Sequence, residues 1–254
     1  MELHGATALV TGGTGGIGAA LVEALRTAGA SVVAADLPGT GADLDLDVTD
    51  GEAVAAAITA LDRLDLVVAN AGIGVAGLVE DLDPDDWRRS VEVNICGAVN
   101  TVLPAYARLR GQRSGSIVVM SSLAGLAGTP LLTPYAMTKA ALVGLGASLR
   151  PEAARHGVGV TTVCPGPVDT PLLDAPSATA GVDVRRYLTA SAGAAISPAH
   201  LASLVVEAVR RDRPLVVPGR GGLLWRASRF TPRLTSREIA RGMRKELRSG
   251  SGGT

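Results

Sequence analysis

The sequence predicts a single α/β domain built on one doubly wound parallel sheet of about seven strands, with helices on both faces. Short runs rich in Val, Ile and Thr alternate with longer segments rich in Ala and Leu, and this alternation is typical of repeated strand–helix units. The strand-like runs are almost continuously apolar, as expected when helices cover both faces of a parallel sheet. Aromatic residues make up only 2% of the chain, so the core must be built from aliphatic side chains.

Strands and helices are expected to alternate along the chain, and several helices carry their own end signals. Asp83 and Ser197 each precede a proline, which combines an N-cap residue with proline at the first helical position. Gly157 follows the end of an apolar pattern, as at many helix C-termini. The expected strands are 6–11, 31–36, 65–70, 116–121, 158–164 and 214–219. The expected helices are 16–28, 50–61, 84–110, 134–156 and 198–211.

The chain length of 254 residues suits one domain with a large core. We expect residues 1–219 to form that domain, with 172–197 as a lid over the substrate. Residues 220–254 form a basic extension whose last residues, "SGSGGT", are of low complexity and expected to be disordered.

Charge and composition exclude several classes of protein. The formal net charge is zero, which argues against a nucleic-acid-binding protein. The two cysteines, Cys96 and Cys164, stand in no metal or redox spacing and are expected to be buried thiols. His4, His156 and His200 form no ligand cluster, so no metal is expected. No signal peptide or membrane span is visible, and we expect a soluble cytoplasmic protein.

A glycine-rich turn, "VTGGTGGIG" at 10–18, joins the first strand to the first helix. Glycines let the backbone turn tightly and let a pyrophosphate approach the helix N-terminus, where free N–H groups favour an anion. The sequence therefore predicts a Rossmann-type dinucleotide site. The turn residues expected to contact the cofactor are Gly12, Thr14, Gly16, Ile17 and Gly18.

The second strand ends in an acid, Asp36, about 20 residues after the turn, as a dinucleotide site requires. A carboxylate there can accept hydrogen bonds from the adenosine ribose and would repel a 2′-phosphate. Neither Thr14 nor Leu37 supplies a cation for that phosphate. NAD is therefore the expected cofactor, in preference to NADP.

The glycine spacing is GxxxGxG, and "DLDVTD" (45–50) and "NAG" (70–72) follow it. With these motifs the chain resembles the short-chain dehydrogenase/reductase family over roughly residues 5–219. The resemblance implies that the acid–hydrophobic pair Asp47–Val48 holds the adenine. It also implies that Asn70, Ala71 and Gly72 line the cofactor.

Tyr135 and Lys139 stand four residues apart on an expected helix, so their side chains share one face. The free pKa of tyrosine is about 10, and a nearby ammonium favours the phenolate. We therefore expect Lys139 to lower the pKa of Tyr135 toward 7 and to hydrogen-bond ribose hydroxyls. The chain has only one other lysine, Lys245, among its 24 basic residues. Tyr-x-x-x-Lys is the active-site motif of the family that the chain resembles, which implies that Tyr135 is the general acid/base.

The resemblance assigns the other site residues by their place in the family pattern. Ser122, thirteen residues before Tyr135, would hydrogen-bond the substrate oxygen. Asn94 would bend its helix and hold a water of the proton relay. In "CPGPVDTP" (164–171), Val168 and Thr170 would meet the nicotinamide carboxamide. Two further residues of that segment are expected to contact the cofactor: Pro165 and Gly166.

These residues predict an NAD-dependent oxidoreductase that interconverts a secondary alcohol and a ketone. The Leu- and Ala-rich lid suggests an apolar small-molecule substrate such as a steroid, lipid or terpenoid. Two alternatives stay open: a 3-oxoacyl thioester reductase of the same family, and a non-catalytic NAD-sensing or scaffold protein. The resemblance also implies a homodimer or homotetramer.

The C-terminal extension is strongly basic. Between Arg220 and Arg248 it carries nine basic and two acidic residues, a net +7. Ile239, Met243 and Leu247 recur every fourth residue, which predicts one apolar helical stripe. The pattern favours a helix packed on a neighbouring subunit or on the acidic body. A helix lying on an anionic membrane is the alternative, and nucleic acid is a distant third because few aromatics could stack on bases.

Overall fold

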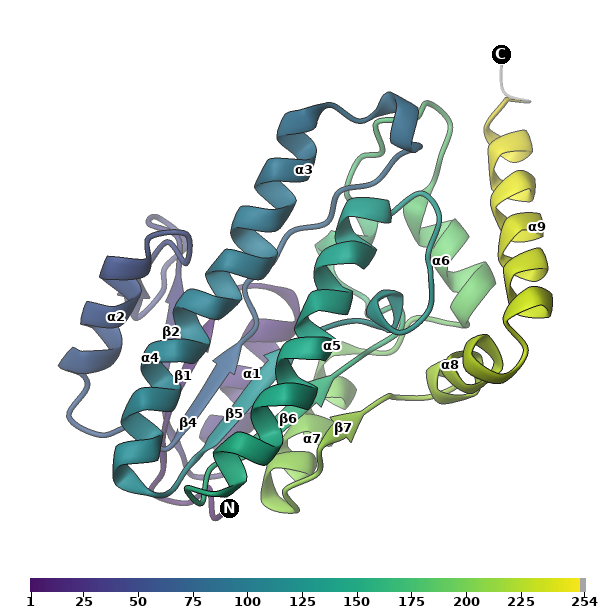
Figure 1. The fold of residues 1–254 in the computed structure, drawn as a ribbon. Coiled ribbons are helices and arrows are strands. Elements are labelled where there is room, and N and C mark those ends of the chain that lie inside the picture. The colour runs from purple at the N-terminus through teal and green to yellow at the C-terminus, as the bar shows by residue number, and fades with distance from the viewer. Residues whose placement is uncertain (252–254) are drawn as a thin grey trace.

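All seven strands of the sheet are parallel, in the order β3-β2-β1-β4-β5-β6-β7. Figure 1 shows this computed structural model, which describes residues 1–251. The order runs outward from β1 in both directions, which is the doubly wound arrangement expected from the sequence. The strands are β1 Thr7–Thr11, β2 Ser31–Asp36, β3 Leu44–Asp45, β4 Leu66–Ala69, β5 Ser116–Met120, β6 Gly159–Val163 and β7 Leu215–Val216.

Helices cover both faces of this sheet, with α1 and α7 on one face and α2, α4 and α5 on the other (Figure 1). Each of the five expected helices is present, and the two caps that precede a proline are confirmed: Asp83 and Ser197 accept backbone hydrogen bonds at the starts of α3 and α7. The helices are α1 Gly16–Thr27, α2 Gly51–Ala60, α3 Pro84–Val91, α4 Gly97–Gln112, α5 Thr133–Ala154, α6 Val184–Ala192, α7 Pro198–Arg210, α8 Gly221–Phe230 and α9 Pro232–Ser251.

Two aliphatic clusters form the core, one on each face of the sheet. On β1, Ala8 and Val10 pack into the cluster under α1 and α7, whereas Leu9 packs into the cluster under α4 and α5. Successive side chains of a strand point to opposite faces, so a strand buried on both faces must be apolar at every position. This explains why the strand sequences do not alternate.

One expected helix, 84–110, is divided by an irregular turn. The segment Glu92–Cys96 is a π-helical turn between α3 and α4. Such turns insert an extra residue into a helix and occur often at functional sites. Here the turn contains Asn94, whose side chain is held by the backbone of Ile73. The same region corrects an expectation, because Cys96 is exposed while Cys164 is buried as expected.

The lid and the C-terminal extension lie side by side beyond β7. In Figure 1 the yellow helix α9 runs alongside α6, the helix within the expected lid. Met243 and Leu247 of the expected apolar stripe pack against a small cluster that includes Val184 and Tyr187 of α6. The extension thus packs on its own chain. Helix α9 includes Ser251, and the rest of the tail expected to be disordered, 252–254, lies outside the described residues.

Candidate active site

A cavity of about 1220 Å³ lies at the carboxyl ends of the strands. Its wall begins at the glycine-rich turn, passes Ser122, Tyr135 and Lys139, and ends under α6, α8 and α9. Every site residue expected from the sequence lines this cavity except two, Gly18 and Asn94. Crevices at this edge of a doubly wound sheet are where such folds bind their ligands.

The glycine-rich turn requires glycine for steric reasons. Gly12 and Gly16 have φ values of +63° and +50°, a region that favours glycine. A Cβ on Gly18 would lie 1.8 Å from the Gly12 carbonyl oxygen. Gly18 therefore lets the turn close, which is why it does not line the cavity. The turn leaves the N-terminus of α1 open to the cavity, which fits the pyrophosphate of a dinucleotide.

Asp36 stands at the end of β2 and faces this turn. Its carboxylate accepts hydrogen bonds from Thr14 Oγ1 at 2.6 Å, from the Thr14 amide at 3.0 Å and from the Leu37 amide at 2.9 Å. Partial burial alone would raise the pKa of Asp36, but these hydrogen bonds outweigh it and hold the pKa below its ordinary value. Asp36 is therefore a fixed negative charge at one end of the cavity.

The "NAG" segment holds the turn from the other side. Asn70 Nδ2 donates to the carbonyl oxygens of Thr11 and Gly12 at 3.0 and 3.1 Å. Ala71 and Gly72 continue along the cavity wall. The segment therefore joins the end of β4 to the glycine-rich turn.

Asp47 and Val48 line the cavity at the Asp36 end. Asp47 Oδ1 accepts hydrogen bonds from the amide and hydroxyl of Thr49. Val48 lies against Gly97, where a Cβ would come within 2.6 Å of Val48 Cγ2. Glycine at position 97 thus lets the start of α4 approach the loop that carries Asp47 and Val48.

Asn94 is fully buried behind the cavity wall. Its Oδ1 accepts from the Ile73 amide at 2.8 Å, and its Nδ2 donates to the Ile73 carbonyl and to Thr138 Oγ1, both at 3.0 Å. A Cβ added to Gly72 would lie 3.0 Å from Asn94 Oδ1 and 3.2 Å from Lys139 Nζ. Asn94 therefore connects the π-helical turn, the "NAG" segment and the helix that carries Lys139.

Tyr135 and Lys139 lie one turn apart on α5, with Lys139 Nζ 5.5 Å from the centroid of the Tyr135 ring. Lys139 is buried, and its Nζ donates to the Met120 carbonyl at the end of β5 at 3.0 Å. Burial lowers the pKa of Lys139 to about 8. An ammonium held at this place contributes positive charge next to the phenol.

The pKa of Tyr135 departs from the expectation. Desolvation by the surrounding protein raises this pKa above the ordinary value, and the neighbouring Ser122 hydroxyl offsets the shift only in part. The sequence-based expectation was a pKa lowered by Lys139. Instead, the ammonium of Lys139 is directed at a backbone carbonyl and lies over the ring, and the low polarity of the wall dominates.

Ser122 and the loop after β6 complete the wall. Ser122 Oγ accepts from the Ala124 amide at 3.1 Å, while the preceding residue, Ser121, donates its hydroxyl to the Lys139 carbonyl at 2.7 Å. Thr170 reaches the glycine-rich turn, because a Cβ on Gly16 would lie 3.2 Å from Thr170 Cγ2. Three more expected residues of this loop line the cavity: Pro165, Gly166 and Val168.

A comparison with known protein families identifies the family of this chain. Residues 6–180 match the family model for the short chain dehydrogenase. The chain belongs to the short-chain dehydrogenase family. The resemblance expected from the sequence motifs is thereby confirmed. Members of the family are oxidoreductases that bind a nicotinamide cofactor.

Curated relatives within the family act on different substrates. The chain is 39% identical over 171 residues to an acetoacetyl-CoA reductase of Synechocystis sp., covering 64% of this chain and 71% of the relative. It is 36% identical over 189 residues to a 3-alpha-(or 20-beta)-hydroxysteroid dehydrogenase of Mycobacterium bovis, covering 68% and 73%. The family therefore establishes the type of chemistry and leaves the substrate open.

Solved short-chain dehydrogenases share nearly the whole fold. A structure from Streptomyces avermitilis superposes with a TM-score of 0.80 at 25% identity, covering 95% of this chain and 98% of that one. A protein from Burkholderia cenocepacia in complex with NADP gives 0.80 at 25% identity, covering 94% and 99%. One from Burkholderia phymatum in complex with NAD gives 0.79 at 26% identity, covering 92% and 96%.

Sequence reasoning missed the part of the site formed by the C-terminal extension. Helices α8 and α9 form the roof of the cavity, yet no residue beyond 219 was expected there. One available signal was the second lysine of the chain, Lys245. The lining residues of the roof are Leu224, Ala227, Thr231, Leu234, Thr235, Glu238, Ile239, Arg241, Gly242, Lys245, Glu246 and Ser249.

The described residues give two further findings. Among residues 1–251, no group of three or more His, Cys, Asp or Glu side chains could hold a metal ion. Within the same range, no helix has both the length and the apolar character needed to cross a bilayer.

Proposed function

We propose that the protein is an NAD-dependent oxidoreductase that interconverts a secondary alcohol and a ketone on an apolar small molecule. One observation carries the proposal: Ser122, Tyr135 and Lys139 line one cavity that runs from a dinucleotide-type turn to the roof formed by α8 and α9. A nicotinamide cofactor bound at the turn would exchange hydride with the substrate carbon.

Tyr135 is proposed as the general acid/base that exchanges a proton with the substrate oxygen. Its raised pKa keeps the phenol protonated near neutral pH, the form needed to donate a proton during ketone reduction. Ser122 would hydrogen-bond the same oxygen, and the charge of Lys139, 5.5 Å from the Tyr135 ring centroid, would stabilise negative charge as it develops. Asn94 acts through the groups it holds, since its side chain is buried behind the wall.

The preference for NAD is proposed from the charge at the Asp36 end. The Asp36 carboxylate is fixed by Thr14 and Leu37 and would accept hydrogen bonds from ribose hydroxyls. At that end of the cavity, the described lining residues include no arginine or lysine to neutralise a 2′-phosphate. A phosphate next to Asp36 would therefore be repelled.

The apolar substrate is supported by the cavity between Tyr135 and the roof. Aliphatic side chains from the start of α5, the lid and the C-terminal helices line it. They include Leu132, Leu173, Leu188, Leu224, Leu234 and Ile239. A second candidate, reduction of a 3-oxoacyl thioester, is supported by the similarity to the acetoacetyl-CoA reductase.

Self-association is also part of the proposal. Leu103 on α4 and Met137 on α5 are 57% and 43% exposed, although both helices pack their other faces on the sheet. Covering these side chains with a second copy would remove apolar surface from water. Light scattering at micromolar concentration tests the proposed homodimer or homotetramer, and a monomeric mass would contradict it.

The function is tested by following nicotinamide absorbance with a panel of secondary alcohols, ketones and acetoacetyl-CoA, each with NAD(H) and NADP(H). We expect turnover of apolar ketones with NADH in preference to NADPH. Asp36→Ala should narrow the difference between the cofactors by relieving repulsion of the 2′-phosphate. Tighter binding of NADPH than NADH by the parent protein would refute the cofactor assignment, and no turnover of any compound would refute the activity.

A further inference from the structure

The roof of the cavity carries a charge that the proposed chemistry does not use. Its two carboxylates each form an ion pair, Glu246 with Arg186 of α6 and Glu238 with Arg241. These pairs neutralise both carboxylates of the roof. Lys245 lines the same cavity, and within the described chain its ammonium makes no hydrogen bond or ion pair. With Arg186 of α6 included, this end of the cavity therefore carries one net positive charge.

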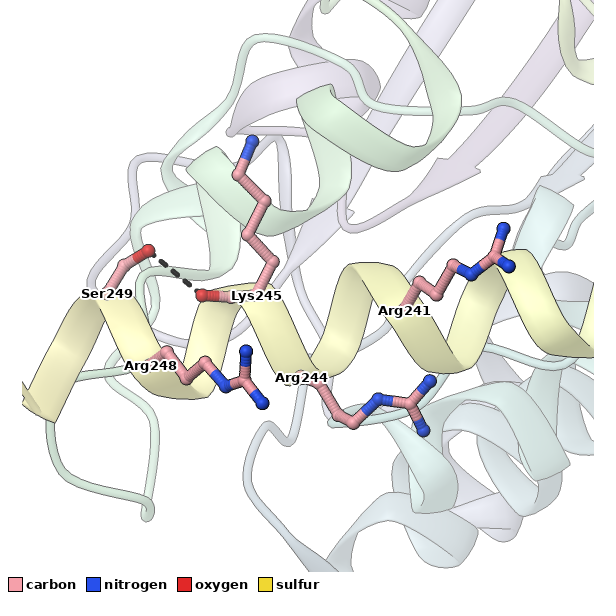
Figure 2. Close-up of a pocket in the computed structure, with 5 residues that line it drawn as sticks. All are labelled: Arg241, Arg244, Lys245, Arg248 and Ser249. Atoms are coloured by element: carbon pink, nitrogen blue, oxygen red, sulfur yellow. Dashed lines mark hydrogen bonds between the residues drawn. The ribbon is translucent and has the colours of Figure 1, made fainter.

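A second pocket lies beside this roof on α9. Its volume is about 360 Å³, and it is lined by Arg241, Arg244, Lys245, Arg248 and Ser249 (Figure 2). These positions fall on one side of the helix because they are spaced by three or four residues. Four of the five side chains are cationic and none is acidic. Any group drawn to this pocket by charge must be an anion.

The two spaces share three residues of α9. Arg241, Lys245 and Ser249 line both the large cavity and the cationic pocket. Figure 2 shows the side chains of Lys245 and Arg244 extending away from each other, across the edge of α9. The cationic pocket and the cavity thus meet at these three residues of α9.

The residue type at position 245 supports a ligand contact. The chain uses lysine only at positions 139 and 245, and both lysines line this cavity. An ammonium is a compact point charge that can meet one anionic oxygen from several directions, whereas a guanidinium is a flat fork. On a helix face that contacts only water, lysine and arginine would serve equally well.

We propose that the site takes amphiphilic anions: substrates with an apolar body and a terminal carboxylate or phosphate. The apolar body would lie along the aliphatic side chains toward Tyr135, and the anionic group would lie against Lys245. This inference names the substrate class of the proposed oxidoreductase and rests on that function. Lys245 determines which substrates bind and takes no part in proton transfer.

Binding of matched ligands to the full chain with NADH tests the proposal without relying on turnover. Octanoate and octyl phosphate are the anionic probes, and octanamide is the uncharged counterpart, all measured by calorimetry. We expect octanoate to bind at least ten-fold more tightly than octanamide. Lys245→Met should remove this difference and Lys245→Arg should restore part of it. Comparing octanoate with octyl phosphate identifies which anion the pocket prefers.

Arg237→Met is the matched control, because Arg237 is an exposed cation on the same helix that lines neither pocket. It should leave the octanoate preference unchanged. Equal affinity of the parent protein for octanoate and octanamide would overturn the inference, even if ketones are turned over. Absence of turnover together with a Lys245-dependent preference for octanoate would instead refute the proposed reaction and still support the anion site.

The basic face of α9 could alternatively contact a membrane, and the same variants distinguish the two partners. Flotation with phosphatidylglycerol vesicles should not depend on Lys245 if the pocket holds a small anion. Loss of vesicle binding in Lys245→Met and Arg244→Met, with no octanoate preference in the parent protein, would assign the face to a lipid surface and overturn the proposal.

Discussion

Lys139 is held in surroundings that disfavour its charge. The side chain is 4% exposed and donates to a single backbone carbonyl, and its pKa is lowered from 10.5 to about 8. The same burial that places the ammonium beside Tyr135 therefore costs stability. The proposed mechanism uses this positive charge next to the phenol of Tyr135.

The lowered pKa of Lys139 predicts a pH-dependent stability. Below about pH 8 the lysine is charged in both the folded and the unfolded state. Between about pH 8 and 10.5 only the unfolded state keeps the proton, so the free energy of unfolding rises with pH in this window. Relative to Lys139→Met, the parent protein should gain about 3 kcal/mol across it. Urea unfolding of both proteins at several pH values measures this gain. A difference in unfolding free energy that does not change with pH would contradict the prediction.

Tyr135→Phe isolates the proton-transfer step. The substitution removes only the hydroxyl, so the wall of the cavity and the charge of Lys139 are retained. We expect kcat to fall by about 10²- to 10⁴-fold, the usual contribution of a general acid/base. NADH affinity, followed by the fluorescence of the bound cofactor, should change little. A variant that keeps more than half of the parent rate would exclude Tyr135 as the proton carrier.

Among the elements, α9 is attached to the lid by one well-enclosed carboxylate. The side chain of Glu246 is 5% exposed. It accepts from Arg186 and from the Asp183 amide that begins α6, the latter at 2.8 Å. These bonds hold the pKa of Glu246 below its ordinary value. The attachment joins the lid and the roof of the cavity.

Glu246→Gln should loosen this attachment by about 1–2 kcal/mol, since it removes the charge from a hydrogen-bonded pair. Hydrogen exchange should then speed up in α6 and α9 while the strands keep their protection. Glu238→Gln is the control, because the Glu238–Arg241 pair is 67% exposed on both sides and such pairs contribute little. Equal acceleration of hydrogen exchange in both variants would show that the two ion pairs contribute equally to holding α9 against α6.

At the scale of the whole molecule, the sheet is independent of the C-terminal extension. The two large core clusters contain no residue beyond Val216, whereas α8 and α9 lie over the cavity and against α6. The extension therefore contributes to the wall of the cavity and not to the two large core clusters.

A chain ending at Gly219 tests this division. We expect NADH binding to persist and the unfolding midpoint to shift little, because the core is intact. KM for apolar ketones should rise by ten-fold or more, since the truncation removes one wall of the cavity. Calorimetric unfolding and steady-state kinetics measure the two effects. Loss of cooperative unfolding in the truncated chain would show that α8 and α9 belong to the folding unit.

The sequence by itself determined six of the seven strands of the sheet, the five helices that cover it and the candidate site residues between Gly12 and Thr170. Continuous apolar runs indicated buried parallel strands, and the spacing of Gly12, Gly16 and Gly18 indicated the turn. Four-residue spacing placed Tyr135 and Lys139 on one helical face. These are local signals, since periodicity, φ preference and helical spacing act over a few residues.

Only the tertiary structure decided the surroundings of these residues. The pKa of Tyr135 rises because residues distant in sequence exclude water from it, which no local pattern records. The π-helical turn at Asn94 and the exposure of Cys96 depend on the packing between separate elements. The stripe of Met243 and Leu247 indicated an amphipathic helix but could not name its partner. Periodicity identifies a buried face, whereas the surface that covers it is set by the path of the whole chain.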